Sequence, residues 1–216
     1  MPSTYGSNNR HAMTQAHPNA RLEALSDGVF AIALTLLILD VKLPSTESIA
    51  STSELWRALQ HLAPSIFAFV LSFGIILITW VNHHATLKLV NNSSASFIYA
   101  NGFLLLTVVS IPFTAGLLGA YLWTDHASPA VVLYNAVLAV QAIAWILVSG
   151  AALKNHLTTD EKSTSTMRDS NRNGYFAFTL YFLLAMTALW FPLAIAMVTT
   201  ATWIFWLGLG IRMKHA

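Results

Sequence analysis

A few polar side chains whose types could perform chemistry lie within otherwise apolar stretches of this sequence. They are Ser26, Asp27, Trp80, His83, His84 and Asn101. If the apolar stretches are antiparallel membrane helices, all six lie at a similar depth. A buried carboxylate needs hydrogen-bond donors, and an indole N–H, an imidazole or an amide supplies them. The pattern therefore predicts a polar cluster around Asp27.

Three interpretations of this cluster are open from the residues alone. It is a network that locks the first helix in position, a relay that moves protons through Asp27 and His83, or a metal site. Adjacent histidines on a helix point about 100° apart, so His83 and His84 are a poor chelating pair, and the i, i+4 spacing of the zinc helix motif is absent. The prediction is therefore no bound metal.

One face of the first helix is the other candidate. Gly28, Ile32, Leu36 and Leu39 recur at spacings of four, four and three, and Thr35 flanks them. Such a stripe is either a face that packs against another helix or the lining of a pore. In a symmetric oligomer each residue would form a ring. Aliphatic rings can gate a pore by dewetting, and a threonine ring offers hydroxyls to an ion.

Asp40 lies at the far end of the same helix. It is either a ring of charge at a pore mouth or a solvated residue that pairs with Lys42, and the sequence does not separate the two. No GxSxG motif, phosphate-binding glycine loop or dinucleotide fingerprint is present, so we expect neither an enzyme nor a cofactor. The TVGYG potassium filter is absent as well.

The composition indicates the elements that must position these residues. Of the 216 residues, 56% are hydrophobic and 9% are charged. Soluble proteins carry about 25% charged residues, so the chain is predicted to be an all-α integral membrane protein in a lipid bilayer. There is no cysteine, and the net charge of +2 with no basic cluster argues against a nucleic-acid partner.

Hydropathy predicts six transmembrane helices. The first four apolar runs are Leu22–Leu43, Leu62 to about Val90, Phe97–Trp123 and Ala130 to about Leu153. Two further spans share Tyr175–Ile211, with a turn between Phe191 and Thr200. The segments 44–61 and 154–173 are predicted to be polar connections. Residues 21–43 as one helix would be about 34 Å long, enough to cross a hydrocarbon layer of roughly 30 Å.

The distribution of Lys and Arg predicts the orientation. Six spans leave Lys42 and Arg57 on one side and the remaining nine basic residues on the other. Both termini are therefore predicted to be cytoplasmic. Residues 1–20 are predicted to be a flexible cytoplasmic tail, residues 21–213 the six-helix domain and residues 214–216 a short C-terminal tail.

Two motifs resemble a known family. Arg21-x-x-x-Leu25-Ser26-Asp27 is similar to the RxxxFSD signature of the transmembrane protein 175 family, the endolysosomal potassium channels and their bacterial homologues. Trp80-x-x-His83-His84 and the six-helix layout are similar to the same family. Leu25 stands where the family signature has Phe. The resemblance covers nearly the whole chain after residue 20.

The resemblance implies a potassium-selective leak-type channel in the cell membrane. A single-repeat chain resembles the bacterial form, which implies a homotetramer whose first helices line a central pore permeable to K+. The constriction would then be Ile32, with further aliphatic layers at Leu36 and Leu39, and Thr35 would contribute to selectivity. Arg21, Ser26 and Asp27 would anchor the first helix. The alternative is a proton channel or proton-coupled carrier that uses Asp27 and His83.

Overall fold

The computed structural model describes residues 19–46 and 49–215, with the backbone alone for Ile204 and residues 207–215. The described chain is helical. Its elements are α1 (Ala20–Leu36), which continues into the 3-10 turn η1 (Leu37–Asp40), α2 (Thr52–His61), α3 (Ala63–Lys88), α4 (Ala95–Tyr121), α5 (Ala127–Lys154), α6 (Glu161–Thr187) and α7 (Pro192–His215). The expectation of an all-α protein is confirmed. The predicted tails of residues 1–20 and 214–216 lie largely outside the described side chains.

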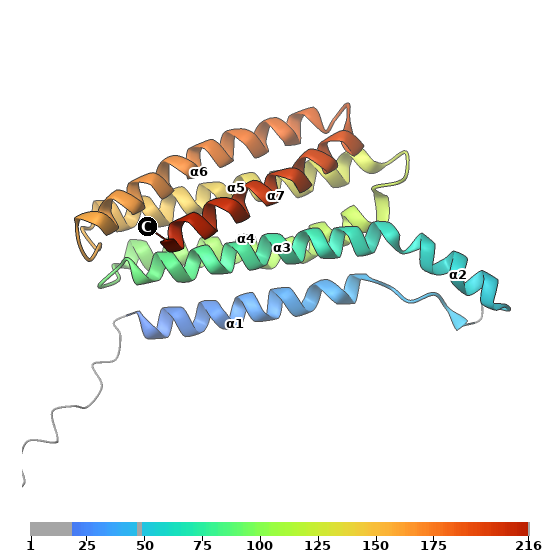
Figure 1. Ribbon diagram of the computed structural model, residues 1–216, viewed down its shortest axis with the longest axis horizontal. Coiled ribbons are helices and arrows are strands. Elements are labelled where there is room, and N and C mark those ends of the chain that lie inside the picture. Colours follow the sequence, from blue (N-terminus) through green and yellow to red (C-terminus); the bar gives the residue numbers. More distant parts are fainter. Residues whose placement is uncertain (1–18, 47–48, 216) are drawn as a thin grey trace, which may run out of the picture.

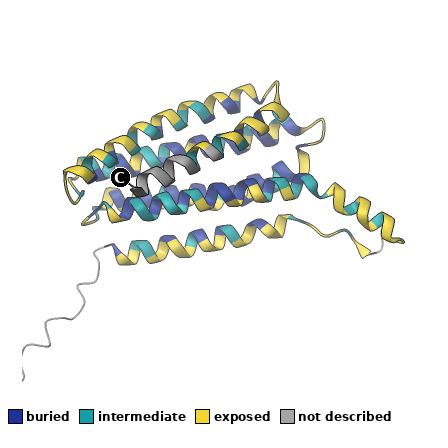
Figure 2. Ribbon diagram, in the orientation of Figure 1, coloured by how far each residue is buried: buried dark blue, intermediate teal, exposed yellow. Residues whose placement is uncertain are grey.

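The long helices run side by side, with α1 at one edge of the bundle and α6 at the opposite edge (Figure 1). Helix α5 packs against α4, α6 and α7, whereas α1 packs against α3 and α4. Burial follows this order: the inner helices carry most of the buried residues, and the outward side of α1 is exposed (Figure 2). One face of α1 is thus not covered by any described residue of this chain.

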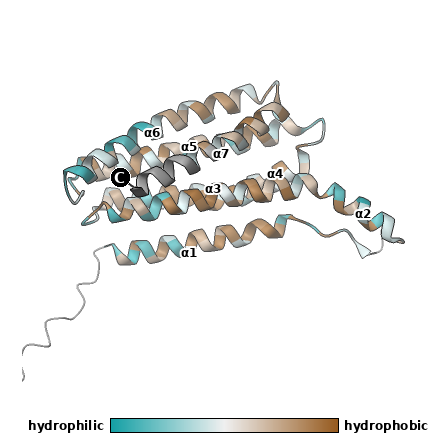
Figure 3. Ribbon diagram, viewed as in Figure 1, coloured by the Kyte–Doolittle hydropathy of each residue, from teal (hydrophilic) through white to brown (hydrophobic). Residues whose placement is uncertain are grey.

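Within the described residues, four segments are long and apolar enough to cross a membrane. They are Ala20–Asp40, Ala63–Lys88, Ala95–Tyr121 and Ala127–Lys154. Helix α6 is hydrophilic in its first half, at the same end of the bundle as the polar start of α1 (Figure 3). The described apolar part of α7 is Pro192–Trp203. The predicted number of six spans therefore stays a prediction for α6 and α7.

The predicted connection at residues 154–173 is wrong in its second half, because α6 begins at Glu161. Asp160 caps the helix by accepting a hydrogen bond from the Ser163 backbone N–H at 2.7 Å. That bond holds the pKa of the Asp160 carboxyl below its ordinary value. Met167 is buried against α5, and Asn171 Nδ2 donates to Ile146 O at 3.0 Å. Contacts with α5 thus stabilise a helix whose own sequence is polar.

Two further boundaries differ from the hydropathy prediction. The connection at residues 44–61 contains α2, which Ser51 and Glu54 start with a reciprocal capping box. The last break lies at residues 188–191, before the predicted turn, because Pro192 is the first residue of α7. Proline is favoured at a first helical position, where its missing N–H costs no hydrogen bond.

Candidate pore-lining face and polar network

A hydrogen bond between α1 and α3 joins the first two predicted site residues. Trp80 Nε1 donates to Asp27 Oδ1 at 2.8 Å. Four residues before Asp27, on the same side of α1, the carboxylate of Glu23 lies 3.1 Å from His84 Nδ1. The rings of Trp80 and His84 stack with their centroids 6.0 Å apart. Two carboxylates of α1 therefore face two aromatic donors one helical turn apart on α3.

A second, deeper pair joins α3 to α4. His83 Nε2 lies 2.8 Å from Asn101 Oδ1, and Asn101 Nδ2 donates to the Phe97 carbonyl at 2.8 Å. His83 and Asn101 are both buried, and the rings of Phe30 and Trp145 lie beside the imidazole. His83 thus donates to Asn101 in a site without solvent, so the pair fixes the ring orientation.

The remaining predicted members of the cluster do not join it. Ser26 is buried, but its Oγ donates to Leu22 O of its own helix at 2.8 Å. Arg21 is exposed, and within the described part of the chain its side chain has no hydrogen bond or ion pair. Sequence reasoning gave no site role to Glu23, although its spacing of four from Asp27 was a usable signal. We refer to Glu23, Asp27, Trp80, His83, His84 and Asn101 as the polar network.

The predicted pore-lining residues share one exposed side of α1. Ile32 is 58% exposed and Leu39 is 69% exposed, and Leu36 and Thr35 lie with them. The opposite side of the helix is buried against α3 and α4 through Phe30, Ala33 and Leu37. A Cβ built at Gly28 would meet no atom within 4 Å. Below, "the α1 stripe" denotes Gly28, Ile32, Thr35, Leu36 and Leu39.

The polar side chains of Thr35 and Asp40 differ in how they lie relative to the exposed side of α1. The Thr35 hydroxyl donates to Ile32 O at 2.9 Å, so its lone pairs remain available as acceptors. Asp40 lies against α4: a Cβ at Gly116 would come within 2.9 Å of its Cγ. Asp40 and Lys42, both described, form no ion pair. The Asp40 carboxylate thus lies beside α4, the residue is exposed, and its role at a pore mouth stays a prediction.

Among the described residues, no group of three or more His, Cys, Asp or Glu side chains is placed to hold an ion. Two hydrogen bonds of the polar network pair a carboxylate with an indole and an imidazole with an amide. His84 Nδ1 is buried without a hydrogen-bond partner among the described residues, although the Glu23 carboxylate lies 3.1 Å away. The arrangement orients α1 and leaves the α1 stripe facing outward.

The sequence is similar to those of known ion channels. The family model described as "Endosomal/lysosomal potassium channel TMEM175" matches residues 21–112. A potassium channel of Chamaesiphon minutus is 36% identical over 182 residues, which covers 82% of this chain and 89% of that protein. A zebrafish (Danio rerio) endosomal/lysosomal proton channel TMEM175 is 38% identical over 114 residues, 50% of this chain and 21% of that protein.

A solved structure has the same fold. The crystal structure of a lysosomal potassium-selective channel TMEM175 homolog from Chamaesiphon minutus superposes with a TM-score of 0.73 at 33% identity. The match covers 87% of this chain and 96% of that one. The similarity therefore extends well beyond the segment that carries the signature motif.

Proposed function

This chain belongs to the TMEM175 family of ion channels, and on that premise we propose that it is a potassium-selective leak channel. The chain is a multi-pass membrane protein. We propose that it acts as a homotetramer in a bacterial cell membrane, with the four α1 stripes lining one central pore. The name of the Chamaesiphon relative supports potassium as the permeant ion.

The observation that carries the proposal is the asymmetry of α1. Its inner side is held by the polar network and by buried Phe30, Ala33 and Leu37, while no described residue of this chain covers the α1 stripe. A helix that packs against its own subunit on one side and is exposed on the other is suited to line a symmetric pore. Four copies around an axis would place Ile32, Leu36 and Leu39 in three successive rings.

Such a pore would have no carbonyl filter. Ile32 is proposed as the constriction, because a ring of isoleucines excludes water until the helices separate. Thr35 is the residue within the α1 stripe that offers an oxygen, and its hydroxyl hydrogen is used within its own helix. We propose that the Thr35 oxygens contribute to the preference for potassium over sodium.

The topology proposed for this channel has six spans with cytoplasmic termini. The polar first half of α6 and the start of α1 lie at the same end of the bundle (Figure 3), which supports that end as cytoplasmic. The basic residues Lys154, Lys162, Arg168 and Arg172 gather there. Lys42 and Arg57 lie on the stretch that joins α1 to α3, at the other end.

A proton channel is the second candidate, because a zebrafish family member is named a proton channel. Asp27 and His83 are the titratable residues that this candidate would use. Their geometry supports it less, since Asp27 accepts from Trp80 and His83 pairs with Asn101, a residue that does not titrate. Under the potassium-channel proposal, Asp27→Asn lowers the amount of folded tetramer; under the proton proposal it abolishes proton flux in intact tetramers.

Ion flux in liposomes tests the function directly. Purified protein is reconstituted, and flux is driven by a potassium gradient, then a sodium gradient, with and without a pH difference. We expect potassium flux to exceed sodium flux at equal pH on both sides. We also expect Thr35→Ala to lower the potassium-to-sodium ratio. Flux that appears only with a pH difference would replace the potassium proposal with the proton candidate, and an unchanged ratio would remove Thr35 from the selectivity mechanism.

A further inference from the structure

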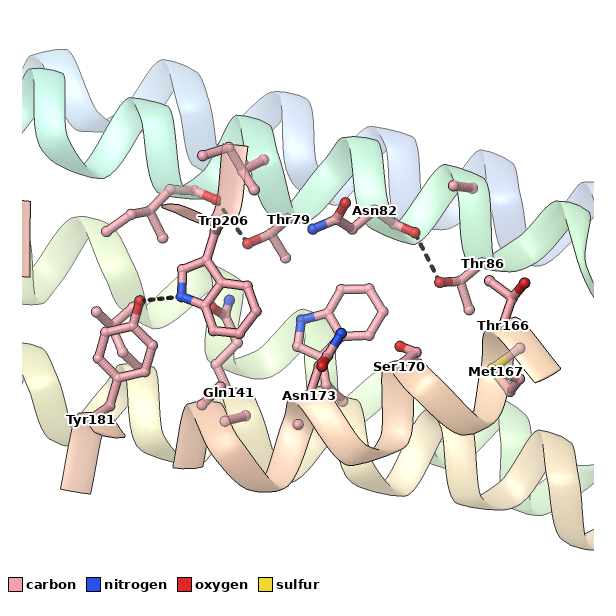
Figure 4. A pocket seen from close by; sticks show the side chains of 18 of the residues that line it. Thr79, Asn82, Thr86, Gln141, Thr166, Met167, Ser170, Asn173, Tyr181 and Trp206 are labelled. Carbon is pink, nitrogen blue, oxygen red and sulfur yellow. Dashed lines mark hydrogen bonds between the residues drawn. The ribbon is translucent and has the colours of Figure 1, made fainter. Parts of the chain in front are cut away.

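A cavity of about 370 Å³ lies inside the subunit, between α3, α5, α6 and α7 (Figure 4). Its volume falls within the range of ligand pockets, about 300–1,000 Å³. It lies on the side of α3 that faces away from α1. Helix α3 lines it with Ile75, Thr79, Asn82 and Thr86, at spacings of four, three and four. The cavity is therefore separate from the α1 stripe and from the polar network.

The two ends of the cavity differ in character. One end is formed by Ile75, Leu138, Tyr181 and Trp206, and the Trp206 indole N–H donates to the Tyr181 hydroxyl at 3.0 Å. Toward the other end, Figure 4 shows amide and hydroxyl side chains of Asn82, Ser170 and Asn173 between the helices. A ligand that matches both ends of this cavity would combine an apolar or aromatic body with a hydrogen-bonding group.

Gln141 supplies an unsatisfied donor to this cavity. Its side chain is 6% exposed, and its Nε2 is buried with no hydrogen-bond partner among the described residues. Figure 4 shows the side chain extending from α5 toward the Trp206 ring. Buried amides in proteins are nearly always paired, so an unpaired one in a cavity indicates a partner that comes from outside the chain.

Other polar side chains of the cavity also have donors or acceptors available for hydrogen bonds. Within the described part of the chain, no hydrogen bond of the Asn82, Ser170 or Asn173 side chain is found. The Thr79 and Thr86 hydroxyls donate to carbonyls of their own helix, Ile75 O and Asn82 O, and so present acceptors. The cavity thus offers amide donors and hydroxyl acceptors together.

The charge of the residues that line the cavity restricts the class of ligand that it can bind. Among the described residues that line the cavity there is no carboxylate, so none of them offers a counter-charge for a cation. Lys88 is the one charged residue of that described lining, and it is exposed and lies beyond Thr86 at the polar end. A charged group seated among Asn82, Gln141 and Asn173 would lose its hydration without an opposite charge in reach.

We propose that this cavity is a binding site for a compact, uncharged molecule that carries both hydrogen-bond donors and acceptors on a planar apolar body. The ligand's polar group pairs with the amides of Gln141, Asn82 and Asn173. Its apolar body lies toward Trp206 and Tyr181. The proposal does not depend on which ion the protein conducts.

The probe for the test is 4-fluorobenzamide, a planar ring with an uncharged primary amide. Its 19F resonance is titrated with the full-length protein in detergent micelles, and protein-free micelles correct for partitioning. Two analogues of the same shape, 4-fluorobenzoate and 4-fluorobenzylamine, carry a negative and a positive charge. We expect saturable binding of the benzamide that is tighter than that of either charged analogue.

Amino-acid substitutions test whether the benzamide binds in this cavity. Gln141→Leu removes the unpaired amide and should weaken benzamide binding by about fivefold. Ala177→Trp fills the cavity and should abolish binding. Gln60→Leu, on exposed α2, is the matched control and should leave it unchanged. If Gln141→Leu does not elute as folded protein, Ser170→Ala replaces it, with weaker binding expected.

Three results would contradict the proposed binding site. They are no saturable binding of the benzamide, equal or tighter binding of a charged analogue, and unchanged binding in Ala177→Trp. The first would mean that water satisfies these polar groups. The second would contradict the uncharged class, and the third would place the bound probe outside this cavity.

Discussion

At the scale of single residues, one hydrogen bond and one carboxylate–imidazole contact join the side chains of α1 to those of α3. Asp27 is exposed, yet its carboxylate accepts a hydrogen bond from the Trp80 indole N–H. The imidazole of His84 lies against the carboxylate of Glu23. These are short contacts between side chains more than fifty positions apart in sequence. They hold the rotation of α1 and so determine which residues of α1 face outward.

Trp80→Phe tests this role. The substitution keeps an aromatic ring but removes the indole N–H, so Asp27 loses its donor. We expect a loss of about 1 kcal/mol, close to what interhelical hydrogen bonds contribute in membrane proteins. For a chain of this size the midpoint of thermal unfolding in detergent should fall by about 2–4 °C. Trp190→Phe, on an exposed side chain, is the control, and an equal fall in both variants would contradict the prediction.

Ile32→Asn tests the proposed constriction. An amide at this exposed position changes the polarity of the α1 stripe without touching the buried side of the helix. A polar ring hydrates more readily than an aliphatic one, so we expect potassium conductance to rise by at least about twofold in planar bilayers. Ala31→Asn, at the adjacent exposed residue, serves as the control. Unchanged conductance in well-folded Ile32→Asn protein would remove Ile32 as the gate.

At the scale of elements, small residues on α4 let its neighbours approach closely. Gly119 contacts Ser65 near the start of α3, where a Cβ would lie 2.8 Å from the Ser65 Cα. Gly116 makes the same kind of room for Asp40. Small residues at helix crossings are a general device of membrane bundles, because packing rather than the hydrophobic effect drives association in lipid. Helix α4 therefore positions both η1 and the start of α3.

A pair of glycine substitutions on α4 tests this packing. Gly119→Ala places a methyl group against the backbone of α3, which cannot move aside as a side chain would. We expect a destabilisation of about 1–3 kcal/mol, typical of overpacking. Gly102→Ala, where a Cβ meets nothing within 4 Å, should be neutral or slightly stabilising. Thermal unfolding in one detergent compares the two, and a milder effect at Gly119 than at Gly102 would refute the close approach.

At the scale of the whole molecule, α1 occupies an edge with one side bare. The buried core lies among α3, α4, α5, α6 and α7, and α1 adds only its inner side to it (Figure 2). Under the proposed assembly this exposed side would face the other subunits. The edge formed by α6 lies on the opposite side of the bundle (Figure 1).

Single cysteines test the assembly, because the chain contains none of its own. Leu39→Cys places a thiol on the α1 stripe, and Trp190→Cys places one at the turn between α6 and α7. Both native side chains are 69% exposed. In oxidised membranes we expect Leu39→Cys to give disulfide-linked dimers on a non-reducing gel and Trp190→Cys to stay monomeric. Cross-linking at Trp190→Cys alone would contradict a central bundle of α1 helices.

Composition and periodicity determined the all-α membrane class, the first four apolar runs and the common depth of Asp27, Trp80 and His83. The family resemblance came from two short motifs, at Arg21–Asp27 and Trp80–His84. Hydropathy and residue spacing are local properties, and one sequence displays them without knowledge of its partners. For the same reason hydropathy failed on α6, whose polar half is helical because Met167 and Asn171 contact α5.

Tertiary structure decided what depends on contacts between distant segments. It paired Glu23 with His84, turned Asp40 toward Gly116, and left the α1 stripe exposed while Phe30, Ala33 and Leu37 were buried. It also placed Gln141 in a cavity that α5, α6 and α7 form together with the distant helix α3. None of these follows from spacing along one helix, because each depends on which helix packs beside it.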